Sequence, residues 1–142
     1  MRNIKSEERE YFGNSAAGFL FVCRDKVLLL HRSNEVYEPL TWGGAGGKIE
    51  HGEKPEKAAH RESQEELGKL PKYKIVDKYV FKDGKFTYTT FIVLVDRQFK
   101  PKLNWENTDY KWATKKDLKQ LKIHFGLVDL LKHKDIFSYE RI

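Results

Sequence analysis

The sequence is poor in the features that would mark a secreted or membrane-spanning protein. It has a single cysteine, Cys23, so an internal disulfide is excluded and a reducing compartment is expected. Cys23 ends an apolar stretch, which is typical of a buried structural thiol. No apolar run approaches the roughly 20 residues of a membrane span, and residues 1–11 lack the apolar segment of a signal peptide. We therefore expect a cytoplasmic protein with no membrane partner.

Charge and composition limit the class of partner. The chain has 27 Lys and Arg against 21 Asp and Glu, a net charge of +6, which favours anionic partners such as phosphates. The lysines are scattered rather than clustered, so nucleic acid is the less favoured of these partners. Since the 142 residues contain no repeat or linker, we expect one domain over 1–142, with 1–13 loosely ordered. Its sequence is compatible with a monomer or a homodimer.

The apolar pattern and the turn residues predict a mixed α/β fold. Strands are expected at 15–23, 27–32, 74–81, 85–96 and 110–113, with a hairpin turn at Asp83-Gly84. Residues 41–49 are expected to be extended and contain four glycines, which allow a ligand to approach the backbone. Helices are expected from near Lys54 to Gly68, from Thr114, and over 126–134. This order predicts a mixed sheet between helices.

The helix expected before Gly68 carries an unusual group of acids. Glu62, Glu65 and Glu66 are spaced three and four positions apart, so their side chains project from one side of the helix. Like charges at this spacing repel one another by a few tenths of a kcal/mol per pair, roughly. Hard divalent cations bound through carboxylate oxygens would compensate this repulsion. The segment therefore predicts a metal site.

The same segment resembles the Nudix box, from Gly47 to Lys69. The fixed positions of that motif are all present, as Gly47, Glu53, Arg61, Glu62, Glu65, Glu66 and Gly68. Two apolar positions of the motif hold Ser63 and Lys69, and Ala45 stands where a proline is common. The resemblance implies the Nudix-type α/β/α sandwich with a mixed β-sheet. It also implies a hydrolase that acts on acid anhydrides in phosphorus-containing compounds.

In this family, water attacks a phosphorus of a nucleoside diphosphate linked to some group X, with Mg²⁺ or Mn²⁺ as the cofactor. Carried over by position, the metal ligands would be Glu62, Glu65 and Glu66, with the carbonyl of Gly47. The resemblance further implies an ion pair between Arg61 and Glu53 that ties the loop to the helix, and Arg61 can also orient Glu65.

A further carboxylate is expected from a distant loop. Glu106 lies before the short strand at 110–113, and it is a candidate metal ligand and catalytic group, with Asp109 as its local competitor. Glu66 is the first candidate for the general base and Glu106 the second. The five histidines show no zinc-ligand spacing, and we expect them to be structural or exposed.

The nucleotide substrate would need further contacts. Arg32, at the end of a predicted strand, and Lys48, beside Gly46 and Gly47, are candidate phosphate-binding residues. Aromatic side chains stack on bases, and the candidates for this role are Trp42, Tyr37 and Trp105.

The sequence leaves the identity of X open. Ordinary or oxidised (deoxy)nucleoside triphosphates and dinucleoside polyphosphates all remain candidate substrates. One alternative is a pyrophosphohydrolase or decapping enzyme that acts on RNA 5′ ends. Another is a Nudix domain that senses a nucleotide without cleaving it, although such domains typically lose a glutamate that this chain retains.

Overall fold

The computed structural model describes residues 15–34 and 39–139. The elements within these ranges are β1 (Ser15–Cys23), β2 (Lys26–Arg32), β3 (Trp42–Gly43), β4 (Ala45–Lys48), α2 (Pro55–Leu67), β5 (Lys74–Asp83), β6 (Phe86–Leu94), β7 (Asn107–Ala113), α3 (Lys115–Leu118) and α4 (Phe125–His133). No helix in these ranges is long and apolar enough to cross a membrane.

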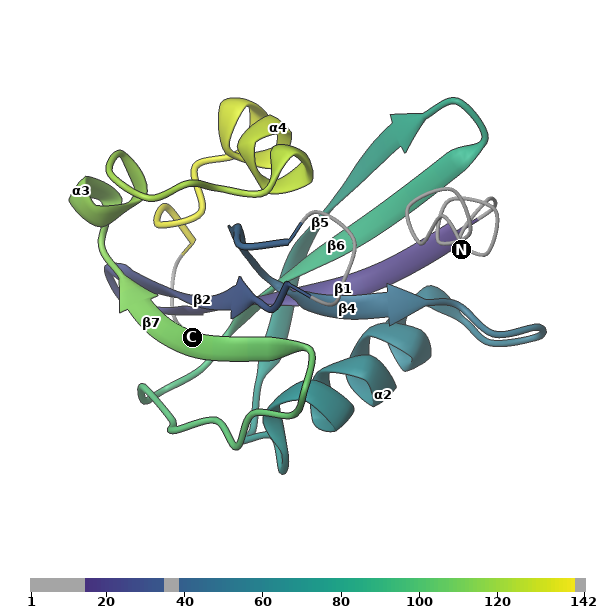
Figure 1. Cartoon of the computed structure of the whole chain (residues 1–142), viewed down its shortest axis with the longest axis horizontal. Helices are drawn as coiled ribbons and strands as arrows, with labels where there is room; N and C mark the ends of the chain where they lie inside the picture. Colours follow the sequence, from purple (N-terminus) through teal and green to yellow (C-terminus); the bar gives the residue numbers. More distant parts are fainter. Residues whose placement is uncertain (1–14, 35–38, 140–142) are drawn as a thin grey trace.

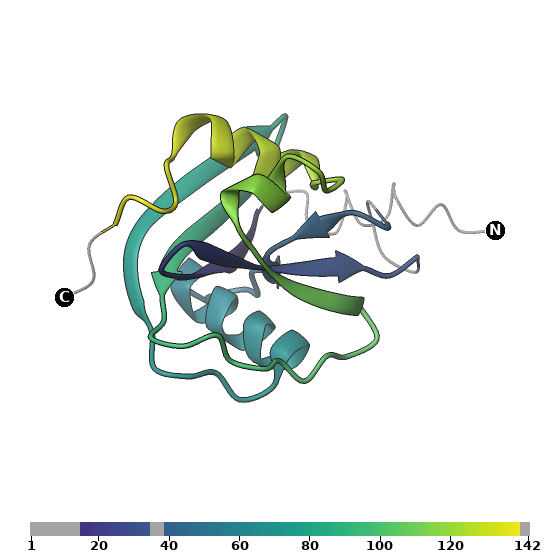
Figure 2. The ribbon, with the colours of Figure 1, turned by 90° about the vertical axis from the view of Figure 1, so that its left-hand side faces the viewer.

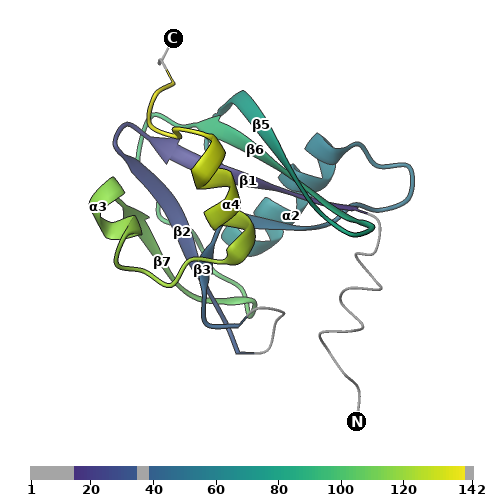
Figure 3. The ribbon, with the colours of Figure 1, turned by 90° about the horizontal axis from the view of Figure 1, so that it is seen from above.

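The strands form a mixed sheet that divides around β1 (Figures 1 and 3). Its main path runs β3-β2-β1-β6-β5, with β1 parallel to β6 and β5 antiparallel to β6. β1 pairs with β2 only at the turn that joins them, where Val22 lies opposite Val27. Further from the turn, β1 pairs with β4 and β2 pairs with β3, while β7 pairs along the other edge of β2. The sheet therefore opens between β2 and β4.

Helices cover both faces of the sheet, as Figure 2 shows with α4 on one side and α2 on the other. Side chains of a strand alternate between faces, so successive residues of β1 enter two different cores. Phe19 and Phe21 pack in the core that includes residues of α2, whereas Leu20 and Val22 pack in the core that includes residues of α4. Cys23 is buried and has a free thiol, as predicted. The predicted α/β/α sandwich with a mixed sheet is confirmed.

Most predicted elements are present, with differences at their ends. α2 begins at Pro55 and is followed by Gly68, whose φ of 81° favours glycine but whose ψ of −156° differs from the left-handed cap that the sequence predicted. The largest difference is in β7, which begins at Asn107 rather than at 110. Pairing with β2 extends it, since the ladder continues through a register shift at His31/Arg32 to the Asn107 pair.

Candidate active site

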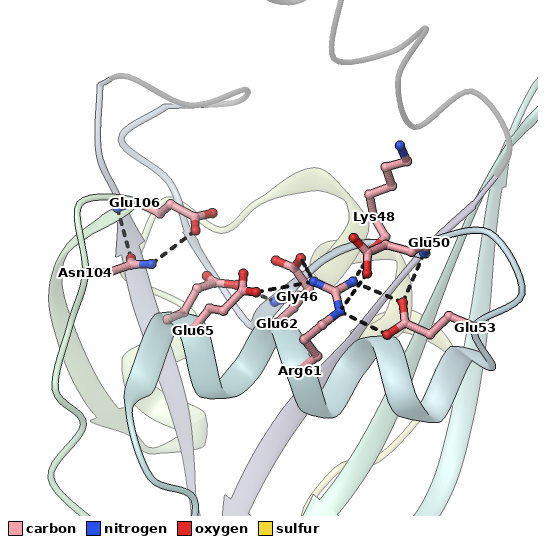
Figure 4. Close-up of polar contacts among 10 residues, drawn as sticks. Gly46, Lys48, Glu50, Glu53, Arg61, Glu62, Glu65, Asn104 and Glu106 are labelled. Carbon is pink, nitrogen blue, oxygen red and sulfur yellow. Dashed lines mark hydrogen bonds and ion pairs between the residues drawn. The ribbon is translucent and has the colours of Figure 1, made fainter.

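Three carboxylates meet where α2 passes β4 and the segment before β7. Glu62 and Glu66 lie on α2, and Glu106 immediately precedes β7. One oxygen of each carboxylate lies within 4.8 Å of an oxygen of the other two. Glu65 does not belong to this cluster. Its exposed carboxylate accepts a 3.4 Å hydrogen bond from Nη1 of Arg61 (Figure 4).

Glu66 is the most buried acid of the site, with 3% of its surface exposed. The backbone N–H of Gly46 donates to its Oε2, and the amide Nδ2 of Asn107 donates to its Oε1, both at 2.9 Å. Burial raises the pKa of Glu66 to about 8, and the charge of Glu106 adds to this effect against the two hydrogen bonds. In the metal-free protein Glu66 is therefore largely protonated at neutral pH.

Arg61 connects the helix with the loop after β4. Its Nε and Nη2 donate to the two oxygens of Glu53 at 2.9 and 3.0 Å, so the ion pair predicted between these residues is present. Nη2 also donates to the carbonyl of Lys48 at 2.9 Å, and Nη1 donates to Glu62 at 2.7 Å (Figure 4). These bonds, led by that of Glu53, raise the pKa of Arg61, and they fix the orientation of Glu62.

Glycine at position 47 allows α2 to approach the strand. A Cβ at Gly47 would collide with the carboxylate of Glu62. The backbone of β4 and the side chain of Glu62 are therefore in direct contact, and this contact depends on glycine.

Glu106 is held by its own loop. Asn104 donates from Nδ2 to Oε1 of Glu106 at 3.2 Å, and its Oδ1 accepts the backbone N–H of Glu106 at 3.0 Å. Burial raises the pKa values of both Glu106 and Glu62, which is the expected result of crowding carboxylates away from water. The exposed Asp109 lies outside the carboxylate cluster, and its Oδ1 accepts the backbone N–H of Tyr110.

The carboxylate cluster fits a hard divalent cation. All three groups offer oxygen donors, which Mg²⁺ and Mn²⁺ prefer, and a cation would relieve their mutual repulsion. The hydrogen bonds to Glu66 and Glu106 orient these side chains, which is a role that outer residues play at metal sites.

A cleft of about 440 Å³ extends from these acids across the α4-facing side of the sheet. At its acidic end it is lined by Glu62, Glu65 and Glu106, and at its aromatic end by Phe81, Phe86, His124 and Phe125. The predicted phosphate-binding residues Arg32 and Lys48 line the cleft, as do Gly46 and Gly47. Trp105 also lines it, with 64% of its surface exposed.

Not every predicted aromatic residue belongs to the cleft. Trp42 is absent from its lining, and it instead packs with the α4-side core and against His31, with ring centroids 4.8 Å apart. The reason is its place in β3, where it pairs with His31 of β2. Tyr37 lies outside the described residues.

The aromatic end contains residues that the sequence did not single out. His124 accepts the backbone N–H of Gly126 at Nδ1, and its ring stacks on Phe125 with centroids 4.6 Å apart. Burial lowers the pKa of His124 to about 4, with a contribution from the charge of Arg32, so the ring is neutral at pH 7 and carries its proton on Nε2. His124 thus lines the cleft, whereas the sequence predicted that each histidine is either structural or exposed.

The architecture and the carboxylate cluster define an α/β/α sandwich domain with an acidic helix beside an open cleft. The model of the NUDIX domain family matches residues 13–133. The chain belongs to this family.

Relatives and solved structures agree with this assignment. A Mycobacterium tuberculosis protein that carries the name 8-oxo-dGTP diphosphatase 3 is 31% identical over 107 residues, which cover 70% of this chain and 49% of the relative. The chain thus spans about half the length of this curated relative. The structure of a Nudix hydrolase from M. smegmatis superimposes with a TM-score of 0.74 at 25% identity, covering 90% of both chains. A C. elegans Ap4A hydrolase shares the fold, with a TM-score of 0.69 at 22% identity over 82% of this chain and 92% of that chain.

Proposed function

We propose that this protein is a metal-dependent pyrophosphohydrolase that cleaves a nucleoside diphosphate linked to X by water attack at phosphorus. The carboxylate cluster at one end of an aromatic-lined cleft is the observation that carries this proposal. Carboxylates suit the metal ions that accompany phosphates, and aromatic side chains suit a nucleobase. A cleft of about 440 Å³ is also within the usual size range for a small-molecule ligand.

Glu62, Glu66 and Glu106 would hold Mg²⁺ or Mn²⁺, and Glu65 and the Gly47 carbonyl are further candidate ligands. When bound, such an ion neutralises charge on phosphoryl oxygens and lowers the pKa of a water molecule. Arg61 keeps Glu62 oriented toward the cluster, and the cationic side chains of Arg32 and Lys48 bind the substrate phosphates.

The hydrogen bonds of the two candidate bases favour Glu106 over Glu66 as the proton acceptor. Both oxygens of Glu66 accept hydrogen bonds, from Gly46 and Asn107, which suits a fixed ligand. Among the described residues, the hydrogen bond to the Glu106 side chain falls on Oε1, and Oε2 can take a proton from the attacking water. This reverses the order that the sequence suggested.

Among substrates, we favour an ordinary or oxidised deoxynucleoside triphosphate, because of the name of the M. tuberculosis relative. Dinucleoside polyphosphates are the second choice, supported by the fold shared with the Ap4A hydrolase. RNA 5′ ends are a third class, for which the net charge of +6 is the supporting observation.

The proposal is tested with a panel of dNTPs, 8-oxo-dGTP, Ap4A, ADP-ribose and capped RNA, each incubated with Mg²⁺, Mn²⁺ or EDTA. We expect one substrate class to be cleaved well above the rest, only with metal, and not by Glu66→Gln. Activity that survives complete chelation would contradict the metal mechanism. Tight binding of one nucleotide without turnover would indicate a sensor instead.

A further inference from the structure

Tyr88 lies on β6 with its hydroxyl in a slot formed by two glycines. Gly18 of β1 and Gly46 of β4 are directly opposite each other in the antiparallel pair. A Cβ on either glycine would collide with Oη of Tyr88. The hydroxyl fits there because neither glycine has a side chain. Tyr88 thereby forms part of the floor of the cleft.

Among the described residues, none forms a hydrogen bond with the Tyr88 hydroxyl. The hydroxyl is not a fully buried atom and faces the open space of the cleft, where water or a ligand can serve as its hydrogen-bond partner. By contrast, Tyr79 on the neighbouring strand β5 donates from its hydroxyl to Asp129 of α4. The free hydroxyl of Tyr88 therefore points to an occupant of the cleft as its partner.

The position of the hydroxyl indicates which part of the occupant it meets. Gly46, on which the hydroxyl lies, donates its backbone N–H to Glu66 at the acidic end. On the other side, Tyr88 pairs with Phe81, whose ring contacts Phe125 at the aromatic end with centroids 5.4 Å apart. The hydroxyl thus lies between the two ends, where the phosphate that carries the nucleoside would cross the floor.

We propose that the Tyr88 hydroxyl donates a hydrogen bond to a non-bridging oxygen of the phosphate attached to the nucleoside. This inference rests on the proposed function, because it assigns the two ends of the cleft to the metal-bound phosphates and to the base. The cationic side chain of Arg32 also lines the cleft, which favours an anionic group there. Tyr88 is then a substrate-binding residue in addition to those that the Nudix box supplies.

The test compares Tyr88→Phe with Tyr79→Phe, which removes the same atom from the neighbouring strand outside the cleft. Calorimetry with Mg²⁺ measures the binding of the four deoxynucleoside 5′-monophosphates and of pyrophosphate to each protein. We expect Tyr88→Phe to weaken monophosphate binding by about 10- to 100-fold, because it removes a hydrogen bond to a charged phosphate. Pyrophosphate affinity and Tm should not fall. Tyr79→Phe should lower Tm through the lost bond to Asp129 and leave both affinities unchanged.

Other outcomes would overturn the inference. Unchanged monophosphate affinity in Tyr88→Phe, or no monophosphate binding by the wild-type protein, would rule out the contact. An equal loss for pyrophosphate and monophosphates, or a lower Tm, would assign Tyr88 a structural role. The proposed function is judged separately, by whether the wild-type protein cleaves any member of the substrate panel and does so only with metal.

Discussion

The acidic end of the cleft is lined largely by one continuous stretch of chain, whereas the aromatic end combines side chains from β5, β6 and the start of α4. Between Gly46 and Glu66, the chain contributes two of the three clustered carboxylates, Arg61 and the backbone that contacts them. The aromatic end instead depends on Phe81, Phe86 and Phe125, which come together only through the sheet and the packing of α4.

The two ends also differ in how their side chains are held. At the acidic end, Glu53 and Glu66 accept hydrogen bonds from groups on a neighbouring element, and Glu62 accepts one from Arg61 on its own helix. At the aromatic end, stacking and edge contacts predominate, such as Phe125 with His124 and with Phe81. Hydrogen bonds constrain geometry more narrowly than ring packing does. We infer that the acidic end defines the chemistry and that the aromatic end defines the substrate.

The largest predicted effect comes from the acidic end. Glu66→Gln should lower kcat by roughly 10³-fold or more, since it removes a charged group of the metal site. Folding should persist, because the amide of Asn107 can turn its oxygen toward the new NH₂ group. Steady-state kinetics and thermal unfolding measure both effects, with the exposed Glu56→Gln on the same helix as control. A folded Glu66→Gln protein with full activity would contradict the assignment of Glu66 to the metal site.

Removing Arg61 should affect the acidic end through geometry rather than through lost ligands. Arg61→Ala is expected to lower kcat/KM by about 100-fold and stability by about 1–3 kcal/mol, since Glu53, Glu62 and the Lys48 carbonyl lose their donor. Urea unfolding and kinetics test this, with the exposed Arg97→Ala as control. If Arg61→Ala matched Arg97→Ala in both measurements, the Arg61 contacts would be ordinary surface pairs.

Because the pKa of Glu66 is raised in the folded protein, we predict that the metal-free protein loses stability as pH rises. Its pKa is 4.5 when unfolded and about 8 when folded, so between these values the unfolded state has released a proton that the folded state keeps. Tm without metal should therefore fall from pH 5 to pH 8. The stabilisation by Mg²⁺ should grow over the same range, because the ion requires the ionised carboxylate. Glu66→Gln should flatten both trends, and trends as steep as those of the wild type would contradict the shift.

A smaller effect is expected from substitution of Trp105, an exposed residue in the lining of the cleft. Trp105→Ala should raise KM by about 10-fold with little change in kcat, because base stacking on an aromatic ring contributes about 1–3 kcal/mol. Its exposed side chain has no large share in the core, so Tm should not change. Kinetics with the best substrate provide the measurement, and an unaltered KM would place the base elsewhere in the cleft.

The smallest effect is expected beneath the acidic end, at Ser63. Its hydroxyl is buried on α2 and has no hydrogen-bond partner among the described residues. Ser63→Ala should stabilise the protein by about 1 kcal/mol, because it removes an unsatisfied polar group, and should leave kinetics unchanged. Urea unfolding measures the difference, and a destabilised variant would reveal a partner for this hydroxyl.

The contrast between the two ends explains how much could be predicted from the sequence. Helical spacing and the family motif were enough to predict the ion pair of Arg61 with Glu53 and the grouping of Glu62 with Glu66, since these relations are local. Tyr88 and His124 were not predicted as residues of the cleft, because their position depends on the parallel pairing of β6 with β1 and on how the chain enters α4. Neither relation is encoded in residue spacing.

Glu106 is the one carboxylate of the cluster that does not come from α2. Binding of Mn²⁺ to its variant is therefore the most direct test of the proposed metal centre. The free Mn²⁺ signal in electron paramagnetic resonance would be followed during titration of the wild-type protein, Glu106→Gln and Asp109→Asn. The account predicts that Glu106→Gln weakens Mn²⁺ binding by about 10-fold or more, whereas Asp109→Asn binds like the wild type. Equal binding by Glu106→Gln and the wild type would contradict a metal centre built from Glu62, Glu66 and Glu106.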